Sequence, residues 1–105
     1  MRIAAAVNEP SLTSSIAERF ARAPYFVILD EEGTLLETIQ NPLLEQGHGA
    51  GGAAARLLSK YNIDIVIVPH VGPNAEDALK LAGIKYIKAE GLTLKEALIK
   101  VKELS

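Results

Sequence analysis

The sequence predicts an α/β fold in which helices flank a mixed sheet of five strands. Three observations predict it. Short apolar runs alternate with amphipathic stretches in the order β-β-β-α-β-α-β-α. Glycine, proline and asparagine separate these runs at short spacing, which is typical of turns. The chain of 105 residues is long enough for one modest core, so we expect a single domain over residues 1–105.

The N-terminal part of the sequence predicts three strands. Residues 2–7 form an apolar run that suits a buried strand. Residues 25–40 predict a β-hairpin, because two apolar runs flank a polar turn that ends in glycine. Between these segments, Ser15 and Glu18 have the spacing of a capping box, so we expect a short helix over about 15–21.

The C-terminal part predicts alternating helices and strands. One helical face is apolar over 53–61, and 63–68 are almost wholly apolar, as in a parallel strand covered on both faces. Pro73 suits the first turn of the next helix, and Gly83 suits the position after its last turn. Residues 84–88 alternate between polar and apolar side chains, which is typical of an edge strand.

The last helix is predicted mainly by its start. Thr93 and Glu96 have capping-box spacing, and Leu92 and Ala97 are placed as a hydrophobic staple. We expect this helix to end near Glu103. Its buried stripe should comprise Leu94, Ala97, Leu98, Val101 and Leu104.

The element order predicts a binding site at one edge of the sheet. The strand over 25–29 should run against the other four, and ligands of open α/β sheets bind outside the carboxyl ends of the parallel strands. Two helix N-termini, a glycine-rich turn, two arginines and both histidines should meet there, and together they suit an anion. The expected cofactor-binding residues are Asn8, Arg19, Arg22, Gly49, Gly51, Gly52 and Gly72, and the expected metal ligands are His48 and His70.

The composition excludes several kinds of site. The chain has no cysteine, which excludes disulfides, a thiol nucleophile, a cysteine-based zinc site and an iron–sulfur cluster held by its own thiolates. Histidine is therefore the only soft metal ligand apart from Met1. Eleven basic and thirteen acidic residues give a net charge of −2, which argues against a broad nucleic-acid surface. The N-terminal apolar run is too short for a signal peptide or a membrane span, so we expect a cytoplasmic protein without nucleic-acid or membrane partners.

The common catalytic motifs do not fit. Gly47, Gly49 and Gly52 satisfy G-x-G-x-x-G, but they do not follow a strand directly and lack the acidic residue of a dinucleotide site. A three-stranded meander followed by αβαβ suggests a ribonuclease H-like three-layer fold, whose nucleases hold two metal ions with carboxylates. The first strand carries no acid, and Asp64 lies near the wrong end of the fourth. A G-x-S-x-G elbow is absent as well, so we expect no enzyme.

Several phrases, in order and spacing, resemble one protein family. They are residues 2–7 (RIAAAV), 19–26 (RFARAPYF), 41–42 (NP), 49–51 (GAG), 71–75 (VGPNA) and the helix start at 93–97. They look like the dinitrogenase iron–molybdenum cofactor biosynthesis family of small prokaryotic cofactor carriers and insertion proteins. The resemblance covers essentially the whole chain. It implies a ribonuclease H-like fold without nuclease activity and a protein partner in cofactor assembly. It also implies transient binding of an anionic iron–sulfur or iron–molybdenum–sulfur cluster, or of its precursor, with histidine or cysteine ligands.

The chain departs from the family at one phrase, and three functions remain open. Where family members often read His-Phe-Gly, this chain reads Arg19-Phe20-Ala21, so that a cation replaces a candidate ligand. The leading hypothesis is non-enzymatic binding or carriage of an anionic metal–sulfur cofactor. The alternatives are a metal-free interaction or regulatory module and, third, an enzyme for a small phosphorylated or carboxylated substrate. Simpler interpretations also exist for the site residues, namely close helix packing at the glycines and a solvated surface at Arg19 and Arg22.

Overall fold

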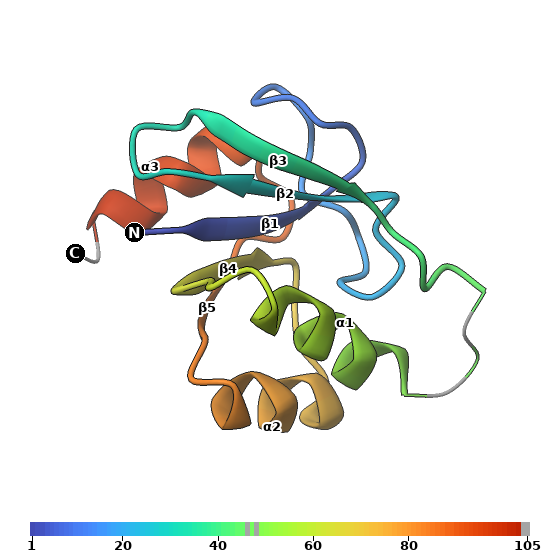
Figure 1. The fold of residues 1–105 in the computed structure, drawn as a ribbon. Helices are drawn as coiled ribbons and strands as arrows, with labels where there is room; N and C mark the ends of the chain where they lie inside the picture. Colours follow the sequence, from blue (N-terminus) through green and yellow to red (C-terminus); the bar gives the residue numbers. More distant parts are fainter. Residues whose placement is uncertain (46, 48, 104–105) are drawn as a thin grey trace.

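The chain folds into a mixed five-stranded sheet with helices on both faces (Figure 1). The structure is a computed structural model that describes residues 1–45, 47 and 49–103. The strands are β1 (Ile3–Val7), β2 (Tyr25–Leu29), β3 (Leu35–Gln40), β4 (Ile65–Val68) and β5 (Lys85–Lys88), and the helices are α1 (Ala50–Ser59), α2 (Pro73–Leu81) and α3 (Leu94–Glu103). The order in the sheet is β3-β2-β1-β4-β5, with β2 antiparallel to β1 and β3, and with β1, β4 and β5 parallel. The predicted α/β class, element order and strand directions are confirmed.

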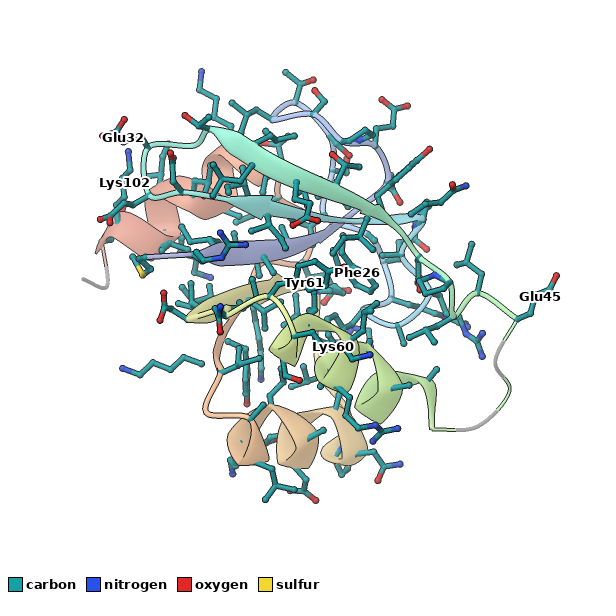
Figure 2. The ribbon with its side chains drawn as sticks, viewed as in Figure 1. Phe26, Glu32, Glu45, Lys60, Tyr61 and Lys102 are labelled. Atoms are coloured by element: carbon teal, nitrogen blue, oxygen red, sulfur yellow. The ribbon has the colours of Figure 1, made fainter. Side chains whose placement is uncertain are left out.

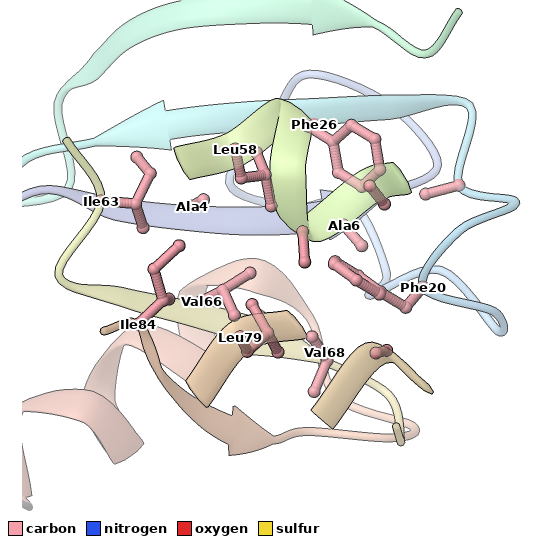
Figure 3. Packing of buried hydrophobic residues seen from close by; sticks show 14 of the residues in the cluster. Ala4, Ala6, Phe20, Phe26, Leu58, Ile63, Val66, Val68, Leu79 and Ile84 are labelled. Carbon is pink, nitrogen blue, oxygen red and sulfur yellow. The ribbon is translucent and has the colours of Figure 1, made fainter. Parts of the chain in front are cut away.

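Two apolar layers lie on opposite faces of the sheet. Helices α1 and α2 cover one face, where Phe26, Leu58 and Leu79 are buried together (Figure 3). Helix α3 covers the other face, where Leu94 and Val101 pack into a second buried cluster. Figure 2 shows Glu32 and Glu45 reaching away from the ribbon, whereas Phe26 lies between the sheet and α1.

The central strand carries small side chains that serve both layers. Ala4, Ala5 and Ala6 of β1 are fully buried, and they alternate between the two apolar clusters as a strand requires. Ala6 lies opposite Phe26 in the register of β1 and β2. A small residue there leaves room for Phe26 to meet Phe20 edge to face, with ring centroids 5.8 Å apart and planes at 63° (Figure 3).

The short helix predicted over 15–21 does not form. Ile16 instead bridges Val7, and the N–H groups of Ile16 and Ala17 donate to the carbonyls of Leu92 and Ala6, both at 2.9 Å. Ile16 belongs to the α3-side cluster and Ala17 to the opposite cluster. Burial of consecutive side chains on opposite faces requires extended backbone, so the capping-box spacing there was misleading.

The predicted start of the last helix is confirmed. Thr93 N–H donates to Glu96 Oε1 at 2.9 Å, and Glu96 N–H donates to Thr93 Oγ1 at 3.2 Å, which is a reciprocal capping box. Four residues of the predicted stripe are buried, namely Leu94, Ala97, Leu98 and Val101. The fifth, Leu104, lies outside the described residues.

Other predicted bounds shift by a few residues. Helix α1 begins at Ala50 rather than at residue 53, so it includes Gly51 and Gly52 despite their low helix propensity, and Gly51 packs closely against Ala75 of α2. Helix α2 begins at Pro73 as predicted, and Gly83 follows its end with a φ of 73° and an N–H bond to the Lys80 carbonyl at 3.1 Å. None of the described helices is long and apolar enough to cross a membrane.

Strand β5 is the last strand in the order of the sheet and is therefore an edge strand, as its alternating sequence predicted. Ile87 is buried, whereas Lys85 and Lys88 at the two ends of the strand are exposed. Lys85 and Ala89 donate to carbonyls of the neighbouring β4 side, so the alternate residue Lys88 turns its carbonyl toward the free edge. The ammonium group of Lys100 from α3 donates to that carbonyl at 2.9 Å.

Candidate functional site

The carboxyl ends of β1 and β4 lie at one edge of the sheet, together with the start of β2 (Figure 1). Helices α1 and α2 begin at the same edge, and the long connection from β1 to β2 crosses it. This placement follows from the parallel pairing of β1 with β4 and the reversed direction of β2. Such an edge is where open α/β sheets bind ligands.

Three adjoining hollows occupy this edge. The first, which we name the arginine hollow, measures about 240 Å³ and is lined by Arg19, Phe20, Ala21, Arg22, Gly51, His70, Val71, Gly72 and Ala75. The second, the mixed-charge hollow, measures about 580 Å³ and is lined by Asn8, Ser15, Ile16, Ala17, Glu18, Arg19, His70, Glu90 and Gly91. The third, of about 300 Å³, is lined by Asn8, Ala17, Glu18, Arg19, Arg22 and Pro24.

Arg19 is the one residue that lines all three hollows. It is exposed, and its guanidinium makes no hydrogen bond or ion pair to any described residue. The next residue, Phe20, is only 4% exposed and packs against Phe26, so the backbone beneath Arg19 is anchored in the core. The structure therefore presents an unengaged cation on a fixed support.

Arg22 is held more tightly. It is half-buried, and its Nη1 donates to the carbonyl of Leu44 at 2.7 Å. A guanidinium carries five N–H donors, so this bond leaves others for a ligand in the arginine hollow. Arg22 also joins the connection between β1 and β2 to the segment that precedes the glycine-rich turn.

The four glycines predicted to bind a cofactor differ in whether they line a hollow. Gly51 and Gly72 both line the arginine hollow, at the starts of α1 and α2. Gly49 is the exposed residue before α1, with a left-handed φ of 71° that favours glycine. Gly52 is buried, and neither it nor Gly49 lines any of the three hollows.

A Cβ at Gly51 would lie 3.0 Å from the Cβ of Ala75, which is tighter than most real Cβ contacts, so one of the two helices would have to shift slightly. Glycine is therefore what lets α1 and α2 approach each other at their N-terminal ends. Residues from the starts of both helices, Gly51 from α1 and Gly72 and Ala75 from α2, thereby line the arginine hollow, and helix N-termini favour an anion.

The histidines and Asn8 complete the predicted set. His70 is exposed and lines both the arginine hollow and the mixed-charge hollow. Asn8 lines the mixed-charge hollow and the third hollow. His48 lies outside the described residues. Within residues 1–45, 47 and 49–103, no group of three or more histidine, cysteine, aspartate or glutamate side chains could hold a metal ion.

The sequence did not reveal the carboxylates of the site. Glu18 and Glu90 both line the mixed-charge hollow, beside Arg19 and His70. Among the described residues, no carboxylate residue lines the arginine hollow, whereas two arginines, Arg19 and Arg22, do. Attraction for an anion is therefore concentrated in the arginine hollow.

A second missed residue is Asn41, which the sequence indicated only as the end of the hairpin. It is 5% exposed, and its Nδ2 donates to the carbonyls of Ala21 at 3.0 Å and Ala23 at 2.8 Å. Its Oδ1 accepts a bond from Leu43 N–H at 2.8 Å. No local pattern signals such long-range contacts, although the Asn-Pro pair was among the phrases that carried the family resemblance.

Comparisons with known proteins give one consistent result. Residues 1–104 match the model of the family described as dinitrogenase iron-molybdenum cofactor. The apo form of the orange protein from Desulfovibrio gigas is similar with a TM-score of 0.89 and 35% identity, over 97% of this chain and 87% of that one. A putative NifB protein from Thermotoga, assigned to the DUF35 family, is similar with a TM-score of 0.79 and 36% identity over the same shares.

A curated relative also matches. It is an uncharacterised protein of Methanocaldococcus jannaschii, 28% identical over 92 residues, which are 85% of this chain and 78% of the relative. The family match spans nearly the whole chain, and the similar structures share its fold at more than 30% identity. The chain therefore belongs to the dinitrogenase iron–molybdenum cofactor family.

Proposed function

We propose that this protein binds and carries an anionic metal–sulfur cofactor, or a precursor of one, in the arginine hollow, and that it catalyses no reaction. The observation that carries the proposal is Arg19, a cation on a fixed support that lines all three of these hollows and has no partner among the described residues. Membership of the family supports the same class of cargo. The orange protein, one of its structural relatives, was solved in an apo form, the term for a protein without its ligand.

The residues fit a cargo held by charge and hydrogen bonds. Two guanidinium groups and the N–H groups of two helix starts point to an anion, since charge-assisted hydrogen bonds are the stronger kind. The chain has no thiolate, and His70 is the one imidazole that the described residues offer to the site. The donor set thus suits a cluster assembled elsewhere, with His70 and His48 as candidate ligands.

Each side chain has a distinct role in this proposal. Arg19 and Arg22 would neutralise the negative charge of the cargo, and the backbone at Gly51 and Gly72 would donate hydrogen bonds to it. His70, between two hollows, would contact the side of the cargo that faces Glu18 and Glu90. Such a set of contacts is reversible, as a carrier requires.

The proposal is tested by retention of a defined cluster. The protein is incubated anaerobically with an isolated iron–molybdenum–sulfur cluster, or with an iron–sulfur cluster, and passed through gel filtration. Absorption spectra and metal analysis then measure what is retained. We expect the wild type to retain one of the two, and Arg19→Met to bind it about tenfold more weakly or worse, because one charge-assisted contact is lost. Retention of neither cluster by the wild type would overturn the proposal.

Two further variants sharpen this test. Arg56→Met removes the same charge from an exposed position near the end of α1 that lines none of the three hollows, so it should bind like the wild type. A double variant, His48→Ala with His70→Ala, should bind more weakly. If the double variant retains the cluster fully, the histidines are not ligands, whereas the role of the arginines would stand.

A further inference from the structure

We infer that Asn41 is a positioning residue of the candidate site: its buried amide fixes the loop that carries Arg19 and Arg22 against the end of β3. The inference rests on the proposed function, because the placement of the two arginines matters only if the edge binds a ligand. It goes beyond that function by assigning a role to a residue that lines none of the three hollows.

The bonds of Asn41 bracket Arg22. Its two Nδ2–H donors go to the carbonyls of Ala21 and Ala23, the residues immediately before and after Arg22, at 3.0 and 2.8 Å. The backbone N–H of Asn41 also donates to the carbonyl of Pro24 at 3.1 Å. Three hydrogen bonds therefore tie one side of the loop to the residue that follows β3.

The other side of the loop is held by packing. Phe20 and Ala23 are buried and point into the core, while Arg19 and Arg22 lie toward the hollows. The loop's own turn bond, from Ala23 N–H to the Phe20 carbonyl, is long at 3.4 Å. Packing fixes Phe20 in place, but the carbonyls on either side of Arg22 depend on the Asn41 amide for their hydrogen bonds.

The chemistry at this position requires an amide. The side chain must donate twice on one side and accept from Leu43 N–H on the other, which Asn does with all of its polar atoms. Aspartate has the same shape and keeps the acceptor, but an ionised carboxylate cannot donate to two carbonyls. In the aspartate variant, the only remaining hydrogen bond among the described residues that holds Arg22 is the one to the carbonyl of Leu44, which lies three residues after position 41.

The first arm of the test needs no ligand. Backbone ¹⁵N relaxation is measured for residues 19–23 in the wild type and in Asn41→Asp, with Asn41→Ala as a second variant that adds no charge. We expect the order parameters of these amides to fall from about 0.85 to below about 0.6 in either variant. Unchanged order in the folded variants would overturn the assignment.

Two controls separate positioning from general damage. Asn62→Asp makes the same chemical change at an exposed residue, and Val101→Ala weakens the packing of α3 on the opposite face of the sheet. Neither should alter the order of residues 19–23. If Val101→Ala loosens that loop as much as Asn41→Asp does, Asn41 is merely structural and the assignment fails.

The second arm measures affinity for whichever isolated cluster, iron–molybdenum–sulfur or iron–sulfur, the wild type retains. We expect Asn41→Asp to weaken binding about tenfold, and much less when Arg22→Met is already present, because the two residues act through one contact. Full additivity of the two changes would overturn the assignment. A wild type that retains no cluster would overturn the proposed function alone, and the relaxation comparison would then decide the role of Asn41.

Discussion

Two adjacent glycines at the start of α1 have different physical roles. At Gly51 a Cβ would lie 3.0 Å from the Cβ of Ala75, a short side chain on the packed helix α2 that cannot turn away as a long one can. At Gly52 a Cβ would meet Nη1 of Arg56 at 3.2 Å, the far end of a flexible, exposed side chain. Only the first glycine is therefore needed for the close approach of α1 and α2.

This difference leads us to expect opposite effects on stability. Gly52→Ala should raise the free energy of unfolding by up to about 1 kcal/mol, because alanine favours the helix and Arg56 can turn away. Gly51→Ala should lower it by about 1–2 kcal/mol, because the cost of overpacking exceeds that gain. Urea denaturation of the pair measures both. A Gly51→Ala protein as stable as Gly52→Ala would show that the helices separate freely.

At the level of residues, the lining of the candidate site could be predicted only in part. Topology alone was enough to bring Arg19, Arg22, Gly51, Gly72 and His70 to the wall of one hollow, because strand ends and helix starts share one edge. The spacing of the glycines in the glycine-rich turn does not indicate that Gly52 is buried. Glu18, Glu90 and Asn41 reach their places through long-range contacts that no local pattern encodes.

The start of α3 shows how a helix end depends on pH. Hydrogen bonds from the backbone N–H and hydroxyl of Thr93 lower the pKa of the exposed Glu96 from its ordinary value of 4.5. The carboxylate is thus favoured in the folded state. Its contribution to stability is present above the unfolded-state pKa and is lost as the pH falls through the lower folded-state pKa.

We therefore expect the stability advantage of the wild type over Glu96→Gln to be constant near neutral pH and to shrink below about pH 4.5. Urea denaturation from pH 7 to pH 3 measures it. Asp30, whose pKa is also lowered, chiefly by a hydrogen bond from the Thr34 backbone, contributes equally to both proteins. Glu45→Gln, at an exposed loop carboxylate, is the control. An advantage that grows at low pH would contradict the capping assignment.

Local signals were reliable for elements only where tertiary pairing agreed with them. Two segments have capping-box spacing, and only the one at Thr93 and Glu96 begins a helix. The other lies where Ile16 bridges the end of β1 and consecutive side chains enter opposite apolar layers. Local spacing could not reveal this, because the competing hydrogen bonds come from residues 6 and 92.

At the scale of the whole molecule, the sheet separates two apolar layers that share β1. The fold was predictable because the strands are marked by period and by β-branched residues, and the order of elements leaves few right-handed topologies. Leu58 represents the α1 and α2 layer, and Leu94 represents the α3 layer, and both are fully buried. Only the first layer supports the arginine hollow.

We expect Leu58→Ala and Leu94→Ala each to lower the free energy of unfolding by about 2–5 kcal/mol, as buried leucines do when a cavity is left. Because both layers rest on one sheet, each variant should still unfold in a single transition. Circular dichroism and hydrogen exchange, as two independent probes, should then report the same transition. Two separate transitions in either variant would show that the layers fold independently.

The lysine at the free edge of β5 has a consequence for how copies of this chain meet one another. An uncovered strand edge is a template onto which another chain can add, and the usual outcome is aggregation. Here the outward carbonyl of Lys88 is taken by the ammonium group of Lys100, and Lys85 and Lys88 place further charge along the edge. Two copies that paired through β5 would have to displace this cation and bring like charges together, so the β5 edge opposes extension of the sheet in that way.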